Sequence, residues 1–268
     1  MANPANGTKR LLQQGYLLRL LVRRNIKNQY YRSFIGVLWT VLNPLLNMLV
    51  MAFVFSELFG MGSEGGLDYP LYILSGNIIF SIMSSSTSGS LPCLVNQQDM
   101  LQKTKVSLAL FPTANVFSSL VTFGFSFIAL LVVALIRFAS GAFVFHWQIL
   151  LTVALLPAVV LFSLGLSYLL STLYVFFRDI QHVYTVLLTL WTYLTPLFYS
   201  IKALNKPIVE KLMKFNPMYH YVTYFRDLLM GTIPSVWTHV VCYGFALGMF
   251  AVGILVMTLV RNKIAAKL

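Results

Sequence analysis

The chain has 268 residues, of which 58% are hydrophobic and only 10% charged. Polar side chains are therefore too few to cover a water-soluble globule of this length, which excludes an ordinary soluble domain. The net charge of +12 could suit a nucleic-acid-binding protein, but seven of the 19 basic residues precede Phe34, directly before the first apolar run. Basic residues in that position orient a membrane protein, so we expect no nucleic-acid partner and direct contact with membrane lipids instead.

The first 33 residues are basic and amphipathic. In a helical projection Arg19, Arg23 and Lys27 share one side, and Leu17 and Leu21 lie on another. This pattern predicts a helix that lies in the cytoplasmic surface of the membrane. The segment has no apolar core ahead of a small-residue cleavage site, so we expect no cleavable secretion signal.

Six apolar segments follow, and several exceed about 18 residues without an ionisable group, the length that a helix needs to cross a bilayer. They predict an all-α fold in which residues 34–260 form one transmembrane domain and residues 261–268 a cytoplasmic tail. Pro44 interrupts the first segment, where a lost backbone hydrogen bond favours a kink. The predicted spans are residues 34–59, 69–91, 108–136, 147–177, 183–200 and 237–260, each to within a few residues.

The basic residues also orient these spans. Most of them fall in the N-terminal arm, after the second and fourth spans and at the C-terminus, which places both termini in the cytoplasm. The segment 201–236 lies outside and is predicted to be a re-entrant helical hairpin, because its apolar part, 215–230, is too short to cross. Asn216 and Pro217 suit the N-cap and first turn of its second helix.

The sequence shows no pattern for catalysis or metal binding. The four histidines do not occur at metal-ligand spacing, and Cys93 and Cys242 fall near opposite faces of the membrane, which argues against a disulfide. Asp227 follows Arg226, and we expect the two residues to compensate each other's charge at the end of the hairpin. We therefore predict neither an enzyme nor a metal site.

Four short motifs occur in order along the six-span frame. They are Tyr31-Arg32-Ser33-Phe34-Ile35-Gly36-Val37-Leu38-Trp39 continuing to Asn43-Pro44, Lys105-Val106 with Phe111-Pro112, Phe177-Arg178-Asp179-Ile180, and Asn216-Pro217 with Phe225-Arg226-Asp227. The motifs are distributed from residue 31 to residue 227, so the resemblance extends over most of the chain. In this order the chain resembles the type-2 ABC transporter permeases that export polysaccharides.

The resemblance implies a permease of the bacterial cytoplasmic membrane that forms a homodimer and pairs with two copies of a separate ABC ATPase. The implied cargo is a polyprenyl-pyrophosphate-linked glycan such as O-antigen, capsule or teichoic acid. The chain contains no G-x-x-x-x-G-K-[ST] motif, the loop that cradles the phosphates of ATP. We therefore expect the partner subunit to bind ATP and magnesium, and this chain to carry no cofactor.

The resemblance also places a coupling helix, which docks on the ATPase, at about residues 96–105. A second contact would be the turn at Arg178 and Asp179. The residues expected to make the first contact are Asn96, Gln97, Gln98, Asp99 and Lys103. An ordinary solvated loop and a simple topology charge are the alternatives at these two places.

A basic cluster lies where the pyrophosphate-linked lipid of this family would enter from the inner leaflet. Its members are Arg23, Arg24, Lys27 and Arg32. Guanidinium groups suit phosphate because they form bidentate hydrogen bonds. The alternative is attraction to anionic head groups in general, about 1 kcal/mol per basic residue.

Aromatic residues on the first and fifth spans are the expected lining of the glycan path, since flat rings offer apolar faces to sugar rings. The candidates are Trp39, Phe53, Trp191 and Tyr193. Interfacial belts and helix packing account for most other aromatic residues. The hairpin would act as an outer gate, with the candidate residues Asn216, Pro217, Arg226 and Asp227.

Three other interpretations fit parts of the sequence. An ABC permease for drugs or small lipids would differ in the size of its cargo. A membrane-embedded enzyme of lipid-linked sugar metabolism would need an acidic pair or a His and Asp cluster at a membrane face, and the 7 acidic residues form no such pattern. A scaffold or an ion channel would function without nucleotide.

Overall fold

A computed structural model describes residues 4–30, 36–58, 67–103, 106–199 and 207–267. The regular elements within these ranges are helical, which confirms the predicted all-α class. They are α1 (Pro4–Tyr30), α2 (Gly36–Phe53), the π-helix η1 (Val54–Leu58), α3 (Tyr69–Ser90), α4 (Cys93–Asn96), α5 (Gln98–Lys103), α6 (Leu110–Ala139), the 3-10 helix η2 (Trp147–Leu151), α7 (Thr152–Phe176), α8 (Ile180–Leu194), α10 (Pro207–Lys214), α11 (Pro217–Leu229) and α12 (Val236–Lys267).

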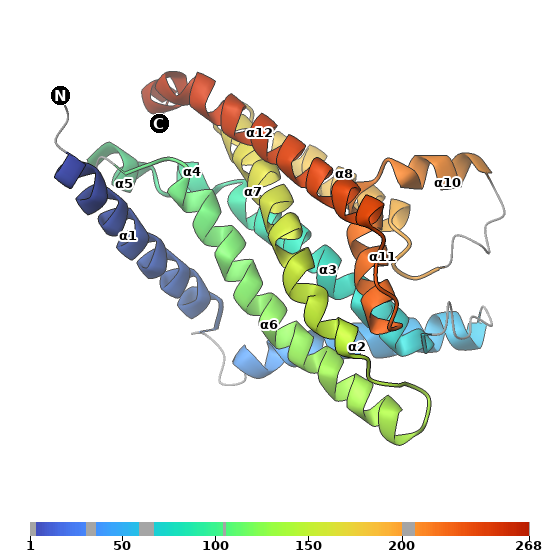
Figure 1. Cartoon of the computed structure of the whole chain (residues 1–268). Helices are drawn as coiled ribbons and strands as arrows, with labels where there is room; N and C mark the ends of the chain where they lie inside the picture. Colours follow the sequence, from blue (N-terminus) through green and yellow to red (C-terminus); the bar gives the residue numbers. More distant parts are fainter. Residues whose placement is uncertain (1–3, 31–35, 59–66, 104–105, 200–206, 268) are drawn as a thin grey trace.

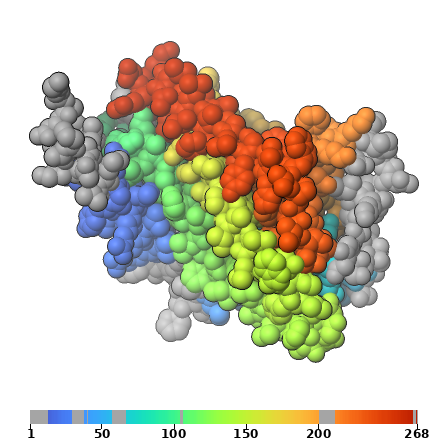
Figure 2. All heavy atoms as spheres, viewed as in Figure 1, coloured from blue at the N-terminus to red at the C-terminus, as the bar shows by residue number. Residues whose placement is uncertain are grey.

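Three of the described helical segments are long and apolar enough to cross a membrane. They are Leu110–Ala139, Trp147–Phe176 and Val236–Ile264, which correspond to α6, η2 with α7, and most of α12. These helices lie side by side (Figure 1) and make up much of the face shown in Figure 2. The other predicted spans coincide with the shorter or more polar helices α2, α3 and α8. A membrane protein is therefore supported, and the count of six spans stays a prediction.

The predicted fifth span is shorter as a helix than expected. α8 ends at Leu194, and Thr195 adopts an extended conformation with φ −96° and ψ 129°. A residue before proline is disfavoured in the helical region, so Pro196 ends the helix at this point. The carbonyl groups of Pro196 and Leu197 then accept hydrogen bonds from Arg226, a side chain on α11.

α3 and α11 form the centre of the molecule. Ile73 and Ile79 of α3 are inaccessible to solvent, as are Tyr221 and Phe225 of α11. Asn216 is the N-cap of α11 and accepts a hydrogen bond from the backbone N–H of the second helical residue, which confirms the predicted start of this helix. The second half of the hairpin is thus a core element.

α1 lies alongside α6 (Figure 1). Leu21 of α1 is buried in a cluster that includes Leu110 and Phe111 of α6. Asn25 donates a hydrogen bond of 2.9 Å to the side chain of Asn115 on α6. The apolar side predicted for α1 therefore packs against protein, and its location in the membrane surface stays a prediction.

α7 and α12 approach each other closely at two glycines. A Cβ atom at Gly253 would overlap the carbonyl group of Gly165, and a Cβ atom at Gly165 would overlap the backbone of Met249 and Phe250. Small residues allow such contact between the backbones of membrane helices. The pairing of α7 with α12 thus depends on the absence of a side chain at both positions.

We expect Gly253→Ala to destabilise the protein by about 1–3 kcal/mol, because the added methyl group forces two packed backbones apart. In an open helix the same substitution would stabilise by about 1 kcal/mol. Gly248→Ala on the same helix is the matched control, since no atom lies within 4 Å of the added Cβ. Thermal unfolding in detergent, followed by size-exclusion chromatography, measures both variants. Equal melting temperatures would contradict the close contact.

Candidate functional site

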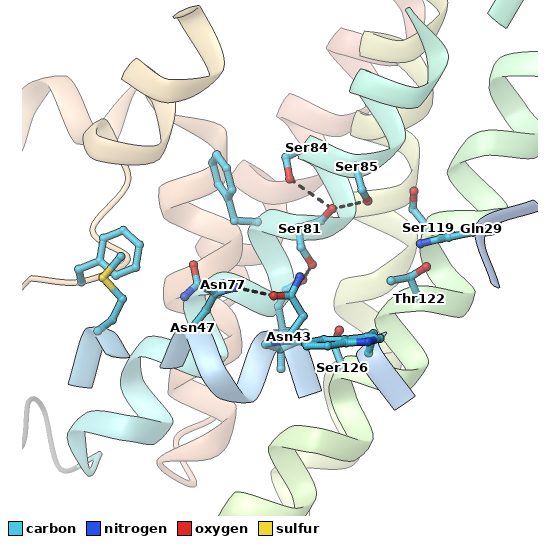
Figure 3. Close-up of a pocket in the computed structure, with 16 residues that line it drawn as sticks. Gln29, Asn43, Asn47, Asn77, Ser81, Ser84, Ser85, Ser119, Thr122 and Ser126 are labelled. Carbon is cyan, nitrogen blue, oxygen red and sulfur yellow. Dashed lines mark hydrogen bonds between the residues drawn. The ribbon is translucent and has the colours of Figure 1, made fainter. Parts of the chain in front are cut away.

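A polar cavity of about 550 Å³ lies between α1, α2, α3 and α6 (Figure 3). Its polar lining consists of amide and hydroxyl side chains, and no lining residue in the described part of the chain is charged. These residues are Gln29, Asn43, Asn47, Asn77, Ser81, Ser84, Ser85, Ser119, Thr122 and Ser126. The apolar part of the lining includes Trp39, Met51, Phe80 and Phe198.

A second cavity of about 300 Å³ continues the first. The two share Gln29, Ser85, Ser119 and Thr122, and the second extends to Gly89 near the end of α3. We call the two cavities together the polar groove. It follows α3 from residue 77 to residue 89, or roughly 18 Å at about 1.5 Å per helical residue.

The residues that line the groove recur at helical spacing on α3 and α6. Residues 77, 81, 84 and 85 of α3 line it, and so do residues 115, 119, 122 and 126 of α6. Positions three or four residues apart lie on one face of a helix. The opposite face of α3 carries Ile82, Met83 and Ser86, which are buried in the core. One face of α3 therefore holds the fold together, and another presents hydrogen-bonding groups to a cavity.

The groove offers neutral hydrogen-bonding groups of both kinds. Ser81 and Ser85 donate to carbonyl groups of their own helix, at 2.7 and 2.5 Å, so that their oxygen lone pairs are left to accept. Asn47 donates to the side-chain oxygen of Asn43 at 3.2 Å, which leaves the NH₂ group of Asn43 as a donor. Each such hydrogen bond contributes a net ~0.5–1.5 kcal/mol, enough to orient a hydroxylated ligand without holding it tightly.

The structure separates the four aromatic residues predicted for the glycan path. Trp39 lines the polar groove. Phe53 of α2 and Tyr193 of α8 are each 65% exposed. Trp191 points into the protein, where its indole N–H donates to the side chain of Asn216 at 2.7 Å and its ring meets Phe162 edge-on. Only Trp39 is brought into the groove.

The predicted lipid-binding cluster lies beside the groove. Arg23, Arg24 and Lys27 are exposed on α1, and Arg32 lies outside the described residues. Asn25 and Gln29, on the same two turns of α1, line the groove. A head group bound by the basic side of α1 would thus lie next to the neutral groups of the groove.

The predicted ATPase-coupling residues gather at one end of the molecule. Figure 1 shows α4, α5 and the end of α12 at this end, and α10 and α11 at the other. The ammonium group of Lys267 donates to the carbonyl of Phe176 at 3.1 Å, which places the turn at Arg178 and Asp179 beside the end of α12. Five of the seven predicted residues, Asn96, Asp99, Lys103, Arg178 and Asp179, are exposed.

Arg226 is buried, with 5% of its surface exposed. Its guanidinium group donates to the carbonyls of Pro196 at 2.8 Å, Leu197 at 3.1 Å and Tyr72 at 3.0 Å. The same group lies 3.5 Å from the centre of the Tyr72 ring, a cation–π contact. Arg226 therefore joins α11 to α3 and to the end of α8.

The predicted charge compensation between Arg226 and Asp227 is wrong. Consecutive residues of a helix do not face each other, and Asp227 instead lines a cavity between α11 and α12. Within the described ranges the ion pair joins Asp68 to Arg137, with a hydrogen bond of 2.6 Å. Adjacent positions in a helical sequence thus do not imply contact between the side chains.

Asn216 makes the second connection between the hairpin and α8. Besides capping α11, its side chain accepts from Trp191 and donates to the hydroxyl of Thr195 at 2.9 Å. Among the candidate gate residues, Asn216 and Arg226 thus tie the hairpin to the end of α8. The role of the hairpin as a gate stays a prediction.

Comparisons with known proteins find a matching family and several relatives over most of the chain. The ABC-2 type transporter family matches residues 16–230. The O-antigen export system permease protein RfbA of Myxococcus xanthus is 32% identical over 225 residues, or 82% of each chain. A protein of the same name from Klebsiella pneumoniae is 27% identical over 82% of this chain and 83% of its own. The polysialic acid transport protein KpsM of Escherichia coli is 20% identical over 81% of this chain and 82% of its own.

Proposed function

Because this chain belongs to the ABC-2 type transporter family, we propose that it is the permease subunit of an ATP-driven exporter whose cargo is a lipid-linked polysaccharide. The proposal places it in the bacterial cytoplasmic membrane with both termini in the cytoplasm. The observation that carries the choice of cargo is the polar groove, whose described lining combines amide and hydroxyl side chains with apolar ones and includes no charged residue. The names of the relatives contain O-antigen and polysialic acid, and the hydroxyl groups of a sugar polymer can both donate to and accept from amide and hydroxyl side chains.

The groove and the basic side of α1 suit the two parts of such a cargo. Arg23, Arg24 and Lys27 would bind the pyrophosphate through charge-assisted hydrogen bonds. The first sugars would then lie against the neutral groups of the groove and the ring of Trp39. Weak hydrogen bonds and flat apolar surfaces let a polymer slide, because no single contact is strong enough to hold it.

A second copy of the chain completes the proposal. α2 exposes Leu49, Val50 and Phe53, and α8 exposes Val186 and Leu190, each by more than half of its surface. Both helices thus carry apolar surface available to a partner copy, and the polymer would pass between the two copies. Since Arg226 and Asn216 fix the hairpin to α8, we expect an outer gate to move together with α8.

Purification of the tagged chain from its native host tests the proposal. We expect an ABC ATPase to be recovered at one copy per permease, and ATP hydrolysis to be lost when the phosphate-loop lysine of that ATPase is replaced. Deletion of this chain should leave the polysaccharide inside the cell, measured with a glycan-specific antibody before and after permeabilisation. Recovery of the chain alone, with no nucleotide dependence, would contradict the exporter. Normal surface polysaccharide with loss of drug or small-lipid export would contradict the cargo.

A further inference from the structure

A separate cavity of about 800 Å³ lies between α10, α11 and the beginning of α12. It does not share a lining residue with the polar groove. Its lining combines aromatic rings with ionisable groups and hydroxyls: Lys214, Phe215, Tyr219, His220, Thr223, Asp227, Trp237, Thr238, Val241, Gly244 and Phe245. We call this cavity the hairpin cavity.

Asp227 is the acidic residue of this cavity. It is half-buried, and no ion pair joins it to another described residue. Burial raises the pKa of its carboxyl group above the ordinary value, as happens when a carboxylate is partly desolvated. A cation in the cavity would offset this cost.

Aromatic rings line the same cavity as the carboxylate. Tyr219 meets His220 edge-on, and His220 in turn stacks on Phe245, so three rings from α11 and α12 form one wall. The His220 ring also bonds to the carbonyl of Lys214 at 2.8 Å, which fixes the end of α10 against this wall. Carboxylates and aromatic faces together favour organic ammonium groups.

The rim of the cavity has the composition of a membrane interface. Phe215 is 79% exposed and Trp237 is 73% exposed. Such rings gather where head groups meet hydrocarbon. Along α12 the exposed surface continues with apolar side chains, among them Val240, Leu247 and Leu255. A molecule with a polar head and apolar chains could therefore place its head in the cavity and its chains along the apolar surface of α12.

We propose that the hairpin cavity binds a phospholipid with a primary ammonium head group, such as phosphatidylethanolamine. The ammonium binds the carboxylate of Asp227 among the rings of Tyr219, Trp237 and Phe245. The phosphate lies toward Lys214, and the acyl chains lie along α12. Neither an anionic lipid nor a neutral sugar brings a cation of its own to Asp227. The inference does not depend on the identity of the cargo.

Native mass spectrometry of the purified complex, titrated with phosphatidylethanolamine and phosphatidylglycerol of identical acyl chains, tests the proposal. We expect the wild type to prefer phosphatidylethanolamine, and Asp227→Asn to lose about tenfold of that preference. Trp237→Leu, which changes an exposed side chain and leaves the core intact, should lose roughly threefold. Trp147→Leu removes a similarly exposed ring that does not line the hairpin cavity and should keep the preference.

Two results would overturn the proposal. One is a wild-type protein that retains both lipids equally. The other is a preference that persists in both Asp227→Asn and Trp237→Leu. Neither result would affect the exporter proposal, because export and ATPase recovery are measured separately.

Discussion

The variant Arg226→Met is expected to be destabilised by about 3 kcal/mol or more and to lose export. The substitution removes the donor for the buried carbonyl groups of Tyr72, Pro196 and Leu197. Each hydrogen bond from a charged group contributes about 1.5–3 kcal/mol, and three are lost here, although the carbonyls of Tyr72 and Pro196 keep hydrogen bonds from the hydroxyls of Ser75 and Tyr72. The cation–π contact with Tyr72 is lost as well. Because these contacts hold α11 to α3 and α8, the hairpin should separate from the core.

Thermal unfolding in detergent measures this effect. Arg261→Met is the matched control, because Arg261 is exposed near the end of α12 and its loss should leave the melting temperature nearly unchanged. Arg226→Lys keeps the charge, but one ammonium group cannot reproduce the planar fork that reaches several acceptors, so we expect at most partial recovery. A melting temperature for Arg226→Met equal to that of the wild type would show that these hydrogen bonds do not stabilise the hairpin.

Gly76 gives an independent test of the same contact. A Cβ atom at Gly76 would lie 2.7 Å from a terminal nitrogen of Arg226, so Gly76→Ala should displace the guanidinium group. If both substitutions act through this contact, Gly76→Ala should cost much less in the Arg226→Met background than in the wild type. Additive losses would indicate that Gly76 acts elsewhere.

The sequence predicted the elements whose determinants are local. Long apolar runs predicted α6, α7 and α12, and the pair Asn216 and Pro217 predicted the start of α11. The fifth helix stops before Pro196 and therefore earlier than the predicted boundary at residue 200. In each case the cause lies within a few residues of the effect.

The contacts that the sequence could not predict join distant segments. The acceptors of Arg226 lie 29, 30 and 154 residues away, and they are backbone carbonyls, which any residue type supplies. Asp227 directly follows Arg226 and is the nearest acidic residue in the sequence, so the sequence favoured the wrong partner. Trp191 is similar, because its hydrogen bond to Asn216 depends on how the hairpin folds back.

The serines near the end of α3 lie in two different environments. Ser86 and Ser90 are buried within the helix bundle, as expected for small residues between closely packed helices. Ser81 and Ser85 instead face the polar groove. The polar stripes on α3 and α6 are visible in the sequence at helical spacing, but that they face each other across a cavity follows only from the packing of the two helices.

Ser85→Phe is expected to reduce export by about a hundredfold while leaving the assembled complex intact. Ser85 is exposed and lines both cavities of the groove, so a phenyl ring there fills the passage where the two meet. Loss of several hydrogen bonds of ~0.5–1.5 kcal/mol each would account for a change of that size. Ser85→Ala removes the hydroxyl and keeps the space, and we expect it to retain most export.

Thr258→Phe is the control, because Thr258 is exposed on α12 and lines neither cavity. Surface polysaccharide is measured in a strain that lacks the wild-type permease, together with the amount of permease–ATPase complex recovered. Loss of export in Ser85→Phe alone, at equal recovery, would place the glycan in the groove. Loss in both phenylalanine variants would point to a general effect of an added ring on the permease. Normal export in Ser85→Phe would show that the polymer takes another route, and the exposed faces of α2 and α8 would then be the surfaces to block.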